Sequence, residues 1–147
     1  MSPPPTAAQF AEIEVDTETG QIKVERLLML VDCGRVINPL TAAGQVEGGM
    51  SQGLGFALTE EMLFDENGQP LNPSLVKYHV PKAAEMPVMD TIFIQTEEPS
   101  GPYGAKSVSE IAIDGVAPAV TNALHNATGA WVRELPLTPA RVLAGLK

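Results

Sequence analysis

Alternating apolar and polar residues at the start of the chain predict a β-hairpin. The first strand covers residues 10–15, where apolar positions alternate with polar ones. Residues 16–20 supply the turn, in which Gly20 can take a positive φ at low cost. A second strand follows over residues 21–31, and its later half is continuously apolar. We therefore expect that half to be covered on both faces of the sheet.

A four-residue apolar spacing then predicts a long helix, with Asn38 as its cap and Pro39 at its first position. The apolar stripe of this helix consists of Val46, Met50, Leu54 and Leu58. Glycine is unusually frequent in the same segment: Gly44, Gly48, Gly49, Gly53 and Gly55. Each glycine costs roughly 1 kcal/mol relative to alanine inside a helix, so something must approach this backbone closely. That neighbour is either another helix or sheet, or a ligand.

Later patterns predict a second hairpin, another strand and two helices. The dipeptide Asn67-Gly68 is typical of a type I′ turn between two strands. The apolar alternation in "VMDTIFIQTEEP" indicates the additional strand. A helix capped by Asp114 should end at Gly129, and a short last helix should be capped by Thr138. Strands and helices mixed without a βαβ rhythm indicate an α+β fold, with antiparallel β-hairpins packed with two main helices.

Length and charge narrow the class of protein. Residues 1–9 are expected to be a disordered, proline-rich lead-in, and residues 10–147 to be one domain or part of one. A net charge of −9 with only 9 basic residues disfavours nucleic-acid binding. The chain holds no apolar run long enough to cross a membrane, and its first residues lack the pattern of a secretory signal. We expect a cytoplasmic location and no membrane partner.

Sulfur and imidazole ligands are scarce. The single cysteine, Cys33, excludes an internal disulfide and an iron–sulfur cluster held by this chain alone. His79 and His125 are far apart in the sequence, and neither has a nearby ligand partner. His125 lies in a helical pattern, where a structural role is favoured over metal binding. No metal ligand is predicted.

The stretch "GPYGAKSVSEIAIDG" is the candidate for chemistry, because small and hydroxyl residues surround one lysine and one glutamate. Glu110 could be a general base, but a glutamate at this place could equally cap a helix or form an ion pair. Lys106 could pair with a carboxylate or contact an anion. The backbone amides of residues 104–109 could form an anion nest, although the Walker phosphate-loop pattern is absent.

Three stretches in the same order resemble the molybdenum-binding subunit of the xanthine dehydrogenase and aldehyde oxidase family. They are "VDCGRVINPLTAAGQVEGGMSQGLGFALTEE", "GPYGAKSVSEIAI", and "ALHNATG" followed by "ELPLTPARVL". The resemblance covers only the C-terminal part of that much larger subunit. It implies that residues 10–147 belong to a larger molybdopterin-binding domain.

The resemblance also implies roles for individual residues. Glu110 occupies the place of the family's general base, which serves the water-derived hydroxylation of purines, N-heterocycles or aldehydes. Gln45 matches a glutamine that lies against the molybdopterin cofactor, and Ser107 and Ser109 match the loop along the same cofactor. Many relatives have glycine where this chain has Ser109.

The implied assembly is larger than this chain. The molybdenum cofactor would be shared with a missing N-terminal portion or a partner, and iron–sulfur clusters and FAD would lie only on other subunits. Companion molybdenum-binding, iron–sulfur and flavin subunits and a small-molecule substrate are the expected partners. The alternative is a non-catalytic remnant or structural partner subunit that keeps the fold without the cofactor.

Overall fold

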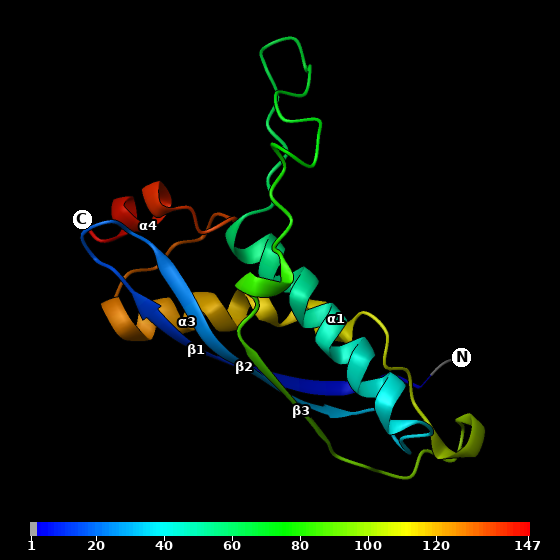
Figure 1. Cartoon of the computed structure of the whole chain (residues 1–147). Coiled ribbons are helices and arrows are strands. Elements are labelled where there is room, and N and C mark those ends of the chain that lie inside the picture. The colour runs from blue at the N-terminus through cyan, green and yellow to red at the C-terminus, as the bar shows by residue number, and fades with distance from the viewer. Residues whose placement is uncertain (1–2) are drawn as a thin grey trace.

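The computed structural model describes residues 3–147 and contains one three-stranded sheet (Figure 1). β1 (Thr6–Val15) and β2 (Ile22–Asp32) are antiparallel, which confirms the first hairpin. Gly20 in the connecting turn has φ +77°, as the sequence indicated. β3 (Val88–Phe93) pairs with the other edge of β2 and is parallel to it. A parallel neighbour requires a long crossover, and here the chain between β2 and β3 includes a helix.

β1 begins four residues earlier than the sequence pattern indicated. Thr6 pairs with Asp32, and the ladder continues without interruption to Glu12, so residues 6–9 belong to the sheet. The expectation of disorder was wrong for these four residues, because pairing with the apolar half of β2 extends the strand toward the prolines. The first two residues of the expected lead-in lie outside the described part of the chain.

The long helix α1 (Pro39–Leu58) has the predicted start. The side chain of Asn38 accepts hydrogen bonds from the amides of Leu40 and Thr41, and Pro39 occupies the first turn. α1 lies across the sheet, on the same side as the later helices (Figure 1). Among residues 3–147, no helix combines the length and apolar character needed to cross a bilayer.

Three further α-helices follow β3: α2 (Ile111–Asp114), α3 (Val116–Thr128) and α4 (Pro139–Gly145). Gly129 ends α3 with φ +77°, and the Thr138 side chain caps α4 by accepting from the amide of Arg141, both as predicted. Asp114 does not cap α3, contrary to the prediction. It is the last residue of the short helix α2, and Gly115 separates α2 from α3. Two 3-10 turns, Ala83–Glu85 and Pro102–Gly104, complete the structure.

The core lies between one face of the sheet and the helices. Leu27, Met29 and Val31 of β2 are buried there. Leu28 and Leu30, which alternate with them, are only half-buried on the opposite face. Coverage on both faces was expected, and within this chain that expectation is wrong. The helices pack on one face only and nothing in residues 3–147 covers the other.

Residues 60–81 form an arm that projects beyond the sheet and helices (Figure 1). The predicted second hairpin is reduced to one isolated bridge between Phe64 and Pro70. Its turn is not type I′, since Gly68 has φ +77° but Asn67 is not left-handed. The carboxylate of Asp65 organises the turn by accepting from the amides of Asn67 and Gln69.

Candidate functional site

Close packing accounts for three of the five glycines in α1. A Cβ on Gly49 would lie 2.5 Å from the Cβ of Ala112, and one on Gly53 would lie 2.8 Å from the Cβ of Val116. These two glycines therefore let α1 approach the backbones of α2 and α3. Gly55 is similarly crowded by the side chain of Glu60. Helix packing, the first of the two explanations for the glycines, holds at Gly49 and Gly53.

The other two glycines face open space. A Cβ on Gly44 or on Gly48 would meet no atom within 4 Å. The two residues are four apart and therefore lie on one face of the helix, with Gln45 beside them. All three are exposed. This part of α1 is a flat strip with bare backbone and one carboxamide, which is a surface that a planar ligand can approach closely.

Gln45 is in direct contact with the loop that carries Glu110. Its side-chain Nε2 donates a hydrogen bond of 3.2 Å to the backbone carbonyl of Ser109, although the two residues are 64 positions apart in the sequence. Glu110 is the next residue. The structure thus brings together the carboxamide and the carboxylate that the sequence singled out. The Gln45 Oε1 accepts no hydrogen bond from the described residues and remains available to a donor.

The carboxylate of Glu110 is exposed and has no structural partner. Glu110 stands immediately before α2, but its side chain makes no capping hydrogen bond. It forms no ion pair with any residue in the described range 3–147. Neither structural alternative, a helix cap or a salt bridge, is therefore realised. An exposed carboxylate without an internal partner can accept a proton from a molecule bound beside it.

Hydrogen-bond donors line the loop before Glu110. The hydroxyls of Ser107 and Ser109 lie 3.1 Å apart and share a hydrogen bond. The backbone amides of Ser107, Val108 and Ser109 find no acceptor within the described part of the chain. Several unpaired N–H groups and hydroxyls on one short loop favour an anionic or strongly accepting ligand, as expected for an anion nest.

Lys106 pairs with the carboxylate of Asp32, which is the first of the two roles that the sequence left open. Its ammonium lies 2.7 Å from Asp32 Oδ2, and the two side chains are only 13% and 16% exposed. The Asp32 carboxylate also accepts from the hydroxyl of Thr96 and from the amide of Gly34. The hydrogen bond from Lys106, followed by the one from the Gly34 amide, lowers the pKa of Asp32 from 3.8 to about 2.

His125 has a structural role, as the sequence favoured. Its ring stacks on Trp131, with ring centroids 4.0 Å apart and an angle of 16° between the planes. Within residues 3–147, no group of three or more His, Cys, Asp or Glu side chains is placed to hold a metal ion.

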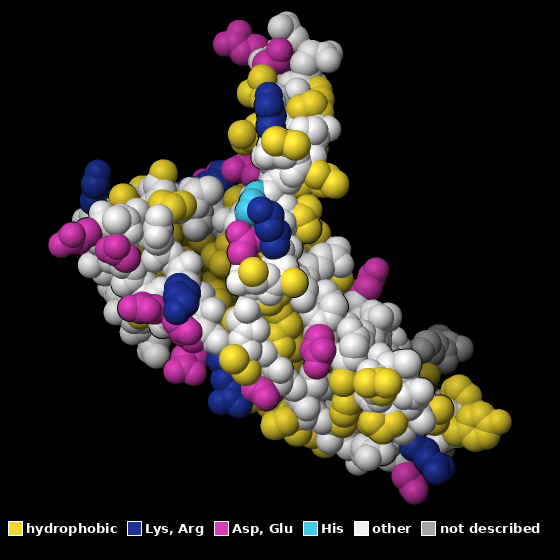
Figure 2. Space-filling model, in the orientation of Figure 1, with side chains coloured by type: hydrophobic (Ala, Val, Ile, Leu, Met, Phe, Trp, Pro, Cys, Tyr) yellow, Lys and Arg dark blue, Asp and Glu magenta, His cyan; other side chains and the backbone are white. Residues whose placement is uncertain are grey.

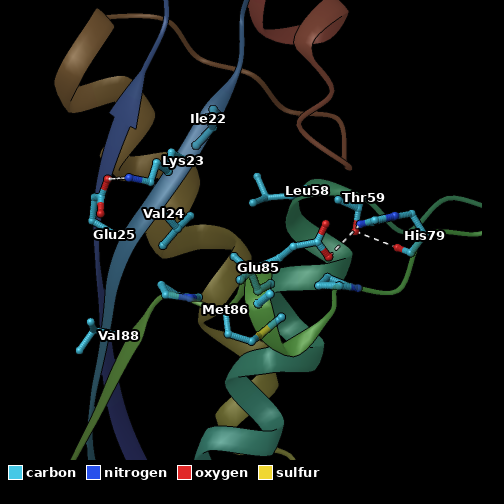
Figure 3. A pocket seen from close by; sticks show the side chains of 14 residues that line it. Ile22, Lys23, Val24, Glu25, Leu58, Thr59, His79, Glu85, Met86 and Val88 are labelled. Carbon is cyan, nitrogen blue, oxygen red and sulfur yellow. Dashed lines mark hydrogen bonds and ion pairs between the residues drawn. The ribbon is translucent and has the colours of Figure 1, made fainter.

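A cavity of about 480 Å³ lies at the base of the arm (Figure 3), and none of the four predicted site residues lines it. Its walls come from the start of β2, the end of α1 and the segment before β3. His79 Nε2 and Glu85 Oε2 lie 3.3 Å apart on one side of it, and apolar side chains such as Leu58 and Met86 form much of the rest. Its exposed acids and bases contact one another, Lys23 with Glu25 and His79 with Glu85, whereas Glu110 has no ion-pair partner in the described chain. We therefore place the candidate site at the open surface beside Gln45.

Two residues that support the site, Asp32 and Thr96, were not predicted from the sequence. Asp32 ends β2 and Thr96 follows β3, and the two meet only because β2 and β3 pair in parallel. A carboxylate at the end of a buried strand, together with an otherwise unassigned Lys106, is the one signal that could have indicated the pair.

Comparison with known proteins identifies the family of this chain. The molybdopterin cofactor-binding domain family matches residues 2–87. The chain is 40% identical to the xanthine dehydrogenase molybdenum-binding subunit of Escherichia coli O157:H7, covering 99% of this chain and 20% of that protein. It is also 40% identical to the aldehyde oxidoreductase molybdenum-binding subunit PaoC of Escherichia coli K12, covering 93% of this chain and 19% of the relative.

Solved structures agree with this relationship. The aldehyde oxidoreductase of Desulfovibrio desulfuricans superposes with a TM-score of 0.89 at 30% identity, over 97% of this chain and 16% of that one. This chain is a mixed α and β segment of a molybdenum oxidoreductase fold. It belongs to the molybdopterin cofactor-binding domain family that includes the xanthine dehydrogenase and aldehyde oxidoreductase molybdenum-binding subunits. The chain spans between 15% and 20% of the length of the curated relatives it matches.

Proposed function

We propose that this chain forms the C-terminal segment of the molybdenum-binding part of a molybdenum hydroxylase, with Glu110 as the general base. The reaction would be the water-derived hydroxylation of a purine, an N-heterocycle or an aldehyde. The molybdenum cofactor, when bound, supplies the redox centre for this chemistry. In the assembled enzyme, Glu110 would take up the proton of the attacking water at its carboxylate oxygen.

The observation that carries this proposal is the contact between Gln45 and the carbonyl of Ser109, 3.2 Å long. This hydrogen bond holds α1 and the Glu110 loop at one surface. Two residues with different tasks, one for cofactor binding and one for proton transfer, can therefore serve the same bound group. The absence of a cap or ion pair at Glu110 among the described residues supports the same assignment.

The residues at this surface fit a molybdopterin. A pterin ring offers both donors and acceptors, and the Gln45 carboxamide can match both kinds. The bare backbone at Gly44 and Gly48 leaves room for close approach, because a Cβ there would project into the open surface. Ser107 and Ser109 add hydroxyls and free amides, which suit a phosphate or another anionic part of the cofactor.

The surface is open, so the assembly must include more protein. We infer that the companion molybdenum-binding polypeptide closes the site over Gln45 and Glu110 and excludes bulk water. Iron–sulfur and flavin groups would lie on other subunits of the complex. The relatives named as a carbon monoxide dehydrogenase large chain and as subunit gamma of a dehydrogenase complex support a subunit role.

The proposal is tested by producing the chain together with its companion molybdenum-binding polypeptide and measuring molybdenum and pterin in the purified complex. We expect about one molybdenum and one pterin for each complex. We also expect Gln45→Ala to lower the pterin content, because it removes the carboxamide and its bond to the Glu110 loop. Glu47→Gln changes another exposed residue of α1, one whose side chain makes no hydrogen bond to the Glu110 loop, so it serves as the matched control and should leave the content unchanged.

A stable complex that contains no pterin would contradict the proposal. It would favour the alternative, a non-catalytic remnant or structural partner subunit that keeps the fold without the cofactor.

A further inference from the structure

A largely buried ion pair connects the loop that carries Glu110 to the sheet. Lys106 lies four residues before Glu110, and its ammonium contacts Asp32 Oδ2 at 2.7 Å. Asp32 is the last residue of β2, which is the central strand of the sheet. The carboxylate also receives a hydrogen bond of 2.8 Å from the hydroxyl of Thr96, which follows β3. One carboxylate therefore joins the ends of two neighbouring strands to the loop.

Backbone contacts reinforce the same junction. The amide of Lys106 donates to the carbonyl of Cys33 at 2.7 Å, and the amide of Arg35 donates to the carbonyl of Gly104 at 2.9 Å. The two segments approach so closely that a Cβ on Gly34 would lie 2.4 Å from the Gly104 carbonyl oxygen. Gly34 also has φ +66°, so this crossing requires glycine.

Beyond Lys106 the loop has few constraints of its own. Through residues 107–109, the only hydrogen bonds within the described range are the one between the two serine hydroxyls and the one that the Ser109 carbonyl accepts from Gln45. Glu110 is followed directly by α2, which packs against α1, and the loop before Glu110 depends on two further attachments. Gln45 holds the loop on one side, and the junction at Lys106 holds it on the other.

We propose that Asp32 and Lys106, supported by Thr96, are positioning residues that fix the Glu110 loop at the distance its proton transfer requires. This inference rests on the proposed function of Glu110, but the anchoring itself is a property of this chain. Neither side chain needs to touch the substrate or the cofactor.

The first test measures hydrogen exchange in the full chain without cofactor. Lys106→Met keeps most of the length of the side chain and removes its charge. We expect the amides of Arg35 and Lys106 to exchange about tenfold faster or more, because a charge-assisted bond no longer closes the junction. Amides of the β1–β2 ladder should exchange as before, and Lys106→Arg should restore slow exchange at both positions.

Asp90→Asn is the matched control. It removes the partner of Arg26 in another ion pair between β2 and β3, 2.6 Å long, with side chains 53% and 39% exposed. Exchange at Arg35 and Lys106 should not change in this variant. If Lys106→Met does not fold, Thr96→Val takes its place, since it removes only the hydroxyl bonds to Asp32 and should shift exchange in the same direction by a smaller factor.

Unchanged exchange at Arg35 and Lys106 in Lys106→Met, or in Thr96→Val where that variant replaces it, would overturn the proposal. An equal acceleration throughout the β1–β2 ladder would also overturn it, because the pair would then stabilise the fold in general.

The second test uses the assembled enzyme. Lys106→Met should lower kcat per bound molybdenum by about 100-fold with KM unchanged, since a displaced base slows proton transfer without weakening substrate binding. Lys106→Arg should keep most of the activity. A rise in KM at constant kcat would contradict a positioning role. An active Glu110→Gln enzyme would reject the proposed base, whereas the exchange results would still report on the junction.

Discussion

The charge on Asp32 links one residue to the stability of the fold. Its carboxylate collects donors from Lys106, Thr96 and Gly34, and the first of these contributes most to lowering the pKa to about 2. A carboxyl group whose pKa is lowered in the folded state stabilises that state at pH values above its ordinary pKa of 3.8. The stabilisation is lost as the pH falls through the folded value.

We therefore predict a pH-dependent difference in thermal stability between the unmodified chain and Asp32→Asn. The unmodified chain should have the higher Tm between about pH 5 and 7, where the Asp32 carboxylate is ionised in the folded and unfolded states alike. The difference should shrink between about pH 4 and 2 as the carboxylate takes up a proton. Thermal unfolding followed by circular dichroism across this range gives the answer. A constant difference down to pH 2 would show that the ionised carboxylate is not what stabilises the junction.

At the scale of elements, α1 has two different glycine surfaces. Gly49 and Gly53 face α2 and α3, where a Cβ would meet neighbouring atoms at less than 3 Å. Gly44 and Gly48 face open space beside Gln45. The adjacent residues Gly48 and Gly49 therefore allow a direct comparison of the two causes of glycine in this helix.

We predict opposite effects of alanine at these two positions. Gly49→Ala should lower the free energy of unfolding by about 1–3 kcal/mol, because the added methyl overpacks the contact with Ala112. Gly48→Ala should raise it by about 1 kcal/mol, since alanine is the better helix former and meets nothing. In the assembled complex, however, Gly48→Ala should lower the pterin content. Urea unfolding of the chain and pterin analysis of the complex measure the two effects.

If the Gly48→Ala variant is stabilised and its complex keeps the full pterin content, Gly48 is not required for cofactor binding. The open face of α1 would then require another explanation.

The sequence predicted those elements whose signals are local. The first hairpin follows from alternation and from Gly20, and α1 and α4 begin where Asn38 and Thr138 can cap them. The predictions that were wrong concerned residues whose conformation depends on other parts of the structure. Asp114 lost its capping role because a separate turn of helix forms before Gly115. The turn at Asn67 is determined by the side chain of Asp65, and a dipeptide pattern does not describe that interaction.

The candidate site was predictable only in part, for a related reason. The four site residues, Gln45, Ser107, Ser109 and Glu110, were chosen by resemblance to a family, and the physical reading of Glu110 left a cap or an ion pair open. The contact of Gln45 with the Glu110 loop joins residues 64 positions apart, and the Lys106–Asp32 pair joins residues 74 apart. The first contact follows from the packing of α1 against α2 and the second from the bridge between Gly34 and Ala105, and the alternation of apolar residues specifies neither.

At the scale of the whole molecule, two apolar surfaces remain without a neighbour in the described chain. One is the sheet face opposite the helices, where Phe10 and Ile92 are 55% and 49% exposed. The other is the arm, along which Figure 2 shows hydrophobic side chains in succession. Its exposed members are Met62, Leu63, Phe64, Leu71, Leu75, Val76 and Val80. Surfaces of this kind are typical of a segment that packs against further protein, consistent with the share of the relatives that this chain spans.

The central claim concerns one carboxylate at the surface shared with Gln45, and it is tested most directly by the turnover per bound molybdenum of the Glu110→Gln complex. We predict normal molybdenum and pterin content together with a fall in kcat of at least about 100-fold, because the amide cannot accept the proton. Glu47→Gln, measured beside it, should retain full turnover. If the Glu110→Gln complex turns over within a few-fold of the unmodified enzyme at equal molybdenum content, Glu110 is not the base.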